Sequence, residues 1–135
     1  MWFNRKKQPA IRSLIGEGTQ IHGELRFDAG LRIDGEVLGD VIATEPTSLL
    51  VISENARVQG KVMANHVIIN NQIQEPMVAT TLLELQPKTR IVGDVHYETL
   101  EMHQGTTIDR MMKHMSNNEA EIDRPLLKLA AANEV

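Results

Sequence analysis

An internal repeat constrains this 135-residue chain more than any other feature of its sequence. Each repeat unit has an apolar residue, an apolar anchor six positions later, a small residue two after the anchor, and an apolar residue four after it. The anchors are Ile21, Ile33, Val58, Ile73, Ile91 and Ile108. The steps between anchors are 12, 25, 15, 18 and 17 residues, with a mean of about 17. Self-similarity at this period is typical of solenoids.

The second unit fits the repeat in two registers, and the sequence leaves both open. The first register places Phe27, Ile33, Gly35 and Val37 in the four positions. The second register places Leu31, Val37, Gly39 and Val41 there, which changes the first two steps to 16 and 21 residues. In either register an insertion falls near Thr44–Ser48, where the composition TEPTS predicts a loop.

A second recurrent position lies three residues after the first apolar residue of each unit. It holds Gly18, Gly30, Asn55, Asn70, Lys88 and Gly105. Glycine and asparagine most readily adopt a positive φ, so this position predicts a corner before each short strand. Apolar residues at alternate positions then give the strand one inward face.

These patterns predict an all-β fold, a single-stranded β-solenoid of about six coils with parallel stacked strands. Only 3% of the residues are aromatic, so the core must consist mainly of stacked aliphatic side chains. The alternative is an ordinary β-sandwich in which the spacing is a coincidence.

The repeat units also resemble a known family, the bactofilins, which are bacterial polymer-forming cytoskeletal proteins. The resemblance lies in the segments GTQIHGEL, LRIDGEVLGDV, ARVQGKV, LELQPKTRIVGDVHYETLEMHQGTTID and MKHM, and covers about residues 13–115. It implies a right-handed β-helix between short flexible tails. It further implies non-polar filaments that assemble without nucleotide, by head-to-head and tail-to-tail stacking of coils. The implied role is a scaffold for cell shape or cell-wall synthesis, with cell-wall enzymes or other scaffold proteins as further partners.

Two residues depart from the family pattern. Glu75 and Arg110 stand where the family usually has glycine. Glu75 precedes Pro76, which favours an extended conformation, so we expect that corner to be reshaped. Arg110 lies in the last coil, where it bears on polymer strength or on the choice of partner.

The end coils of a solenoid carry inward apolar residues that no further coil covers, and isolated solenoids therefore need polar caps. We find no amphipathic capping pattern before the first coil, and the last coil ends in methionines, which suit an adaptable contact surface. We expect residues 14–115 to be the polymerising core; the alternative is that the C-terminal segment folds back as a cap. The residues expected at the polymer interface are Leu14, Ile15, Ile21, Ile108, Met111, Met112 and Met115.

The first thirteen residues form a basic and aromatic arm with a charge of +4 on a body of charge −8. Aromatic and cationic side chains favour an anionic lipid surface, and many arms on one polymer would add their affinities. The alternative is a disordered start with incidental charges. The residues expected to bind membrane are Met1, Trp2, Phe3, Arg5, Lys6 and Lys7.

The segment 116–135 lacks the repeat, and its polar first half predicts disorder. Its second half, RPLLKLAAA, predicts a short helix from Pro125. This segment is either a docking peptide that presents Leu126, Leu127 and Leu129 or a frayed end.

The composition argues against several other classes of protein. The chain has no cysteine, which fits a reducing cytoplasm, and no apolar run approaches the roughly 20 residues that span a bilayer. We find no signal peptide and expect a cytoplasmic protein, peripheral on the inner face of the cytoplasmic membrane. The acidic body argues against nucleic-acid binding.

No pattern in the chain predicts catalysis, a cofactor or a metal site. None of the later coils places a histidine in the column of His22, and His96 and His103 occupy different positions of the repeat. No phosphate-binding glycine loop precedes a helix, which agrees with assembly without nucleotide. Two rival classes stay open: a small solenoid enzyme or metal-binding trimer, like γ-class carbonic anhydrases or acyltransferases, and a membrane-anchored monomeric adaptor.

Overall fold

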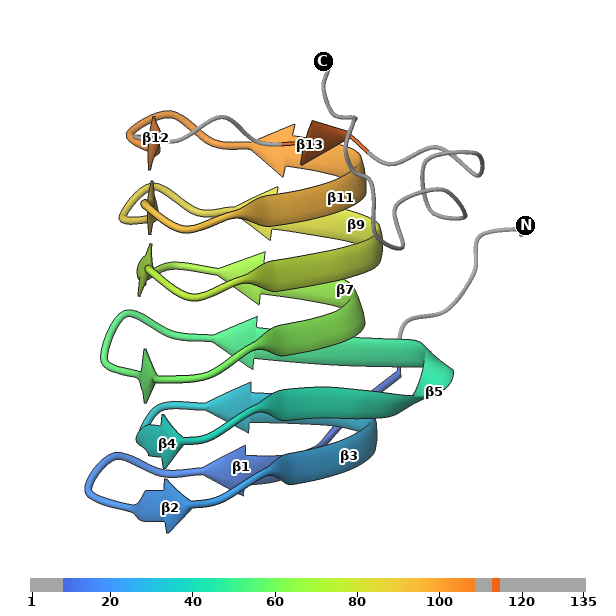
Figure 1. The fold of residues 1–135 in the computed structure, drawn as a ribbon, viewed down its shortest axis with the longest axis vertical. Helices are drawn as coiled ribbons and strands as arrows, with labels where there is room; N and C mark the ends of the chain where they lie inside the picture. Colours follow the sequence, from blue (N-terminus) through green and yellow to red (C-terminus); the bar gives the residue numbers. More distant parts are fainter. Residues whose placement is uncertain (1–8, 109–112, 115–135) are drawn as a thin grey trace.

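The structure is a computed structural model that describes residues 9–108 and 113–114. These residues form a β-solenoid of about six coils, stacked along the long axis of the molecule, and no helix occurs among them (Figure 1). The all-β solenoid predicted from the repeat is therefore confirmed, and the sandwich alternative is excluded. The right-handed sense remains what the family resemblance implies.

Each complete coil combines one long strand and one short strand. The long strands are β1 (Ile11–Ile15), β3 (Leu25–Ile33), β5 (Val41–Ile52), β7 (Val62–Ile69), β9 (Met77–Leu85) and β11 (Val95–Met102). The short strands are β2 (Gln20–His22), β4 (Glu36–Leu38), β6 (Arg57–Val58), β8 (Gln72–Ile73), β10 (Arg90–Ile91) and β12 (Thr107–Ile108). Beyond them lies β13 (Lys113–His114).

The strands form three parallel sheets. The long strands and β13 make one seven-stranded sheet in the order β1-β3-β5-β7-β9-β11-β13. The short strands make two separate sheets, β2-β4-β6 and β12-β10-β8. From β3 to β11 each long strand also changes register midway, as between Phe27 and Ala29, where Ala29 has a φ of 59°. The long strand therefore supplies two sides of the coil and the short strand the third.

The core is a set of aliphatic columns that run from coil to coil. One column on the seven-stranded sheet contains Ile15, Ile33, Ile52, Ile69, Leu85 and Met102. A second column, two residues earlier in each strand, contains Leu31, Leu50, Val67, Leu83 and Leu100. Most of these side chains are fully buried, and each such aliphatic stabilises the fold by roughly 1.5–3 kcal/mol.

The strand pairing settles the register of the second unit. Val37 in β4 pairs with Ile21 in β2 and with Val58 in β6, so Val37 is the anchor of its coil. Ile33 instead ends a long strand and pairs with Ile15. The second register, which places Leu31, Val37, Gly39 and Val41 in the four positions, is therefore correct.

The prediction of a loop at Thr44–Ser48 is wrong, because β5 runs through these residues. Ala43 pairs with Phe27 and Ser48 with Ala29, so the four residues 44–47 stand opposite the single residue Asp28 and bulge outward at the bend. The Thr44 hydroxyl donates to the Phe27 carbonyl over 3.1 Å, and the Ser48 hydroxyl accepts from the Asn65 amide over 3.0 Å. These bonds keep the insertion within the strand.

The corner prediction is confirmed only in part. Gly18 and Gly105 have positive φ values of 92° and 102°. The other four positions do not. Asn55 and Lys88 lie in corners closed by the same kind of turn bond as those of Gly18 and Gly105, such as Thr89 N–H to Gln86 C=O at 3.0 Å. Asn70 lies in the shorter connection between β7 and β8, and Gly30 lies within β3. At Gly30 the requirement is space, since a Cβ there would collide with the backbone of Ala10 and Ile11.

The small residue after each anchor allows close stacking of successive coils. A Cβ on Gly60 would overlap the Gly39 carbonyl, and a Cβ on Gly93 would lie 2.5 Å from the Gln74 carbonyl oxygen. The exception among the described coils is Glu75, and it falls where the short-strand side is interrupted between β6 and β8. The expected reshaping at Glu75 therefore coincides with the missing pairing between the short strands β6 and β8.

An asparagine side chain spans part of this break. The Asn71 Nδ2 group donates to the Ser53 carbonyl over 2.9 Å and also to the Ala56 carbonyl. Lys88, in the corner between β9 and β10, forms an ion pair of 2.7 Å with Glu54, in the corner between β5 and β6. Side chains thus connect coils that the short strands leave unpaired.

Candidate assembly site

The N-terminal end of the solenoid is formed by β1 and β2, which are the edge strands of their sheets. Ile15 continues the inward column and is almost buried, and Ile21 is half-buried. Leu14 pairs with Arg32 on the outer side of the sheet, and 61% of its surface is exposed. The edge therefore presents unpaired backbone groups beside two exposed apolar side chains, Leu14 and Ile11, the latter 43% exposed.

The C-terminal end differs, because its inward columns are open. Met102 stacks on Leu85, and Ile108 stacks on Ile91, so both occupy inward positions. Leu85 and Ile91 are fully buried, whereas Met102 is 49% and Ile108 36% exposed. These two residues expose apolar surface where the described coils end.

The predicted interface residues are thus located only in part. Leu14, Ile15 and Ile21 lie in the first coil and Ile108 in the last short strand, at opposite ends of the molecule. Met111, Met112 and Met115 lie outside the described residues, as does Arg110. The membrane-binding residues Met1, Trp2, Phe3, Arg5, Lys6 and Lys7 and the whole segment 116–135 also lie outside them.

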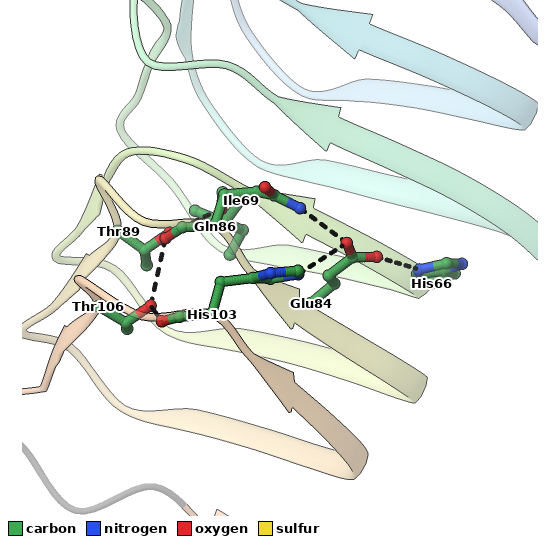
Figure 2. A network of polar contacts seen from close by, with 7 residues as sticks. All are labelled: His66, Ile69, Glu84, Gln86, Thr89, His103 and Thr106. Atoms are coloured by element: carbon green, nitrogen blue, oxygen red, sulfur yellow. Dashed lines mark hydrogen bonds and ion pairs between the residues drawn. The ribbon is translucent and has the colours of Figure 1, made fainter.

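A polar cluster on the outer side of β7 and β9 was not foreseen from the sequence. Glu84 accepts a hydrogen bond from Gln86 at 2.7 Å and lies 3.3 Å from His103 Nε2 and 3.7 Å from His66 Nε2 (Figure 2). These residues come from three successive coils. Their proximity depends on corner lengths, so spacing in the sequence does not reveal it.

Burial lowers the pKa of His66 below its ordinary value, although the negative charges of Glu84 and Glu101 act in the opposite direction. His66 is therefore held neutral at neutral pH. Nearby, the Thr89 hydroxyl donates to the Ile69 carbonyl over 2.6 Å, and the Thr106 hydroxyl donates to the Gln86 carbonyl over 3.2 Å (Figure 2). These contacts are suited to holding coils together.

Within residues 9–108 and 113–114, no group of three or more His, Cys, Asp or Glu side chains is placed to hold a metal ion. The described part of the chain also contains no helix long and apolar enough to cross a bilayer. The features that distinguish the described surface are thus its edge strands and the exposed apolar residues at its two ends.

Comparisons with known proteins agree with this geometry. Residues 13–113 match the family model described as "Bactofilin: Polymer-forming cytoskeletal". A curated relative, Bactofilin BacO of Myxococcus xanthus (strain DK1622), is 28% identical over 93 residues, which are 69% of this chain and 71% of the relative. No solved structure gives a significant match.

Proposed function

The chain belongs to the bactofilin family of polymer-forming cytoskeletal proteins, and we propose that it polymerises through end-to-end stacking of its solenoid. A cytoskeletal family makes this chain a structural protein rather than an enzyme. The observation that carries the proposal is the exposure of Met102 and Ile108 at inward positions of the last described coil. Another coil placed on them would bury both.

The geometry of the edges supports the same contact. Backbone groups of an edge strand template the pairing of a further strand, and β1, β2 and β12 are such edges. A contact that does not close on itself extends into a filament. We infer contacts between like ends, which give a non-polar filament, through the residues Leu14, Ile15, Ile21, Ile108, Met111, Met112 and Met115.

Electron microscopy of the purified protein, in buffer without nucleotide or metal, tests this proposal. We expect filaments from the wild type and small species from Ile108→Arg, because the new charge would be buried at the contact. Thr107→Arg is the matched control, since Thr107 is the outward neighbour of Ile108 in β12. Met112→Arg is expected to behave like Ile108→Arg. Intact filaments from both Ile108→Arg and Met112→Arg would contradict the end contact.

We further propose that the arm predicted at residues 1–13, whose last three residues belong to β1, attaches the polymer to the inner face of the cytoplasmic membrane. The support is the sequence of the arm, with Trp2 and Phe3 beside four cations, each worth about 1 kcal/mol at an anionic surface. One arm would bind weakly, whereas a filament presents many. Such a filament would organise cell shape or cell-wall synthesis from that surface.

Co-sedimentation with anionic vesicles tests the arm. Deletion of residues 2–7 should abolish pelleting with vesicles while filaments still form. Neutral vesicles are the control, because they lack the charge that attracts the cations. If the truncated protein still pellets with anionic vesicles, the arm is not the anchor.

A further inference from the structure

The outer side of the seven-stranded sheet carries an apolar stretch between opposite charges. One outward column runs Arg32, Val51, Ile68, Glu84 through β3, β5, β7 and β9. Leu14 precedes this column and Glu101 follows it. The middle of the column is therefore apolar, with a cation at one end and carboxylates at the other.

The neighbouring outward column widens this apolar stretch. Leu49, His66 and Leu82 pair in succession along it. Leu49 is only 6% exposed, yet it does not belong to the core cluster. Val51, Ile68 and Leu82 are half-buried, although they lie on the outside. We call Leu49, Val51, Ile68 and Leu82 the outer patch.

The order of charges makes this face self-complementary under a two-fold rotation. An axis that lies in the plane of the contact, perpendicular to the column and midway between the levels of Val51 and Ile68, places Val51 of one copy opposite Ile68 of the other. The same rotation places Arg32 opposite Glu84, because Arg32 lies one coil before Val51 and Glu84 one coil after Ile68. An isologous contact requires such self-complementarity.

We propose that the outer patch is a lateral contact, through which filaments of this protein pair side by side with the two subunits of each contact in opposite orientations. This inference rests on the proposed end-to-end polymer. Each contact would bury four apolar side chains of each copy and form two ion pairs. This is a small contact beside stable interfaces, which bury roughly 1,200–2,000 Å². A lone subunit would therefore not dimerise through it. Along a filament the contact recurs with every repeat, and the weak affinities add.

The charges at the rim are available for this contact. The guanidinium of Arg32 lies 2.9 Å from Asp34, yet 49% of its side chain is exposed and its other donors face solvent. Glu84 is held in position by Gln86, with a side chain 20% exposed. A second copy can thus approach both groups without rearrangement of the backbone.

Negative-stain microscopy of wild-type and variant filaments tests the proposal. We expect paired filaments from the wild type and single filaments from Val51→Lys and Ile68→Lys. Met63→Lys is the matched control, because Met63 is an exposed apolar residue on the outer side of the other half of the sheet. Since filaments themselves report a folded subunit, loss of pairing cannot be confused with loss of the fold.

Charge reversal gives a second test of the predicted register. Arg32→Glu and Glu84→Arg should each reduce pairing, and the double variant should restore it, because the two residues face each other across the axis. Pairing that survives Val51→Lys and Ile68→Lys, or that Met63→Lys abolishes equally, would overturn the proposal. A double variant without restored pairing would overturn the register.

The remaining outcomes also distinguish the lateral contact from the end contact. Single wild-type filaments would overturn lateral pairing alone, whereas a wild type without filaments would overturn the end-to-end polymer as well. Single wild-type filaments that pair once residues 116–135 are removed would assign the outer patch to this chain's own C-terminal segment. Each result therefore separates the lateral contact from the end contact.

Discussion

The coil that contains Ile91 and the coil that contains Ile108 show what the repeat determines and what it leaves to the environment. Both anchors occupy the same position and pair directly in register. Ile91 is fully buried, whereas Ile108 is 36% exposed. The sequence pattern thus directs a side chain inward, but only the next coil covers it. Terminal coils therefore carry apolar positions that another copy can complete.

The largest expected contrast comes from the same substitution in the two coils. Ile91→Asp would place an unpaired charge in the core and should unfold the solenoid. Ile108→Asp should leave the monomer folded, because water reaches the new carboxylate, and should impair polymerisation instead. Thermal unfolding followed by circular dichroism measures both. An unchanged melting temperature for Ile91→Asp would contradict the solenoid core.

The second-largest contrast is expected between two glycine-to-alanine substitutions, one between closely stacked coils and one in open space. Gly93→Ala puts a Cβ 2.5 Å from the Gln74 carbonyl oxygen, and such overpacking typically costs about 1–3 kcal/mol. Gly16→Ala, in the first coil, meets no atom within 4 Å and should cost little. Chemical denaturation of the two variants gives the difference. Equal free energies of unfolding would show that the coils separate easily at Gly93.

A smaller contrast is expected for two stacked threonines. Thr89 is 1% exposed and donates to the Ile69 carbonyl, whereas Thr106 is only half-buried. Thr89→Val should lower the free energy of unfolding by about 1 kcal/mol, the usual worth of a buried hydrogen bond. Thr106→Val should lower it less, because water replaces the lost partner. A denaturation curve for Thr106→Val displaced as far as that for Thr89→Val would contradict this ranking.

The smallest effect concerns pH. Burial lowers the pKa of His66 in the folded state, so the unfolded chain binds the proton more tightly. The stability from neutral His66 is complete above its ordinary pKa of 6.5 and falls as the pH drops below it. His66→Gln should therefore flatten the decline in melting temperature between pH 7.5 and 5.5. His103→Gln, at an exposed histidine, is the control; an equal flattening there would contradict the assignment to His66.

Much of the fold follows from the sequence, because inward residues must be apolar in every coil. The register of the second coil does not. Ile33 and Val37 are both inward and fully buried, on adjacent sides of one coil, so either fits an apolar position. The corner between them is two residues shorter than the one between Ile52 and Val58, and a template of fixed spacing cannot represent this.

The surface was less predictable for the same reason. Neighbours across coils depend on every corner length and on the insertion in β5. The outward column of Arg32, Val51, Ile68 and Glu84 has steps of 19, 17 and 16 residues, so it is visible only once the strands are paired. The methionines expected at the C-terminal end, Met111, Met112 and Met115, lie outside the described residues, so their place in the interface stays a prediction.

The break between β6 and β8 has a mechanical consequence. Paired strands connect the coils without interruption along the seven-stranded sheet, whereas on the third side β6 and β8 are not paired and the amide of Asn71 spans part of that gap. A rod held rigidly on two sides and loosely on the third bends most easily in the plane that contains the loose side. A filament of such rods would have one soft bending direction, which recurs in every subunit.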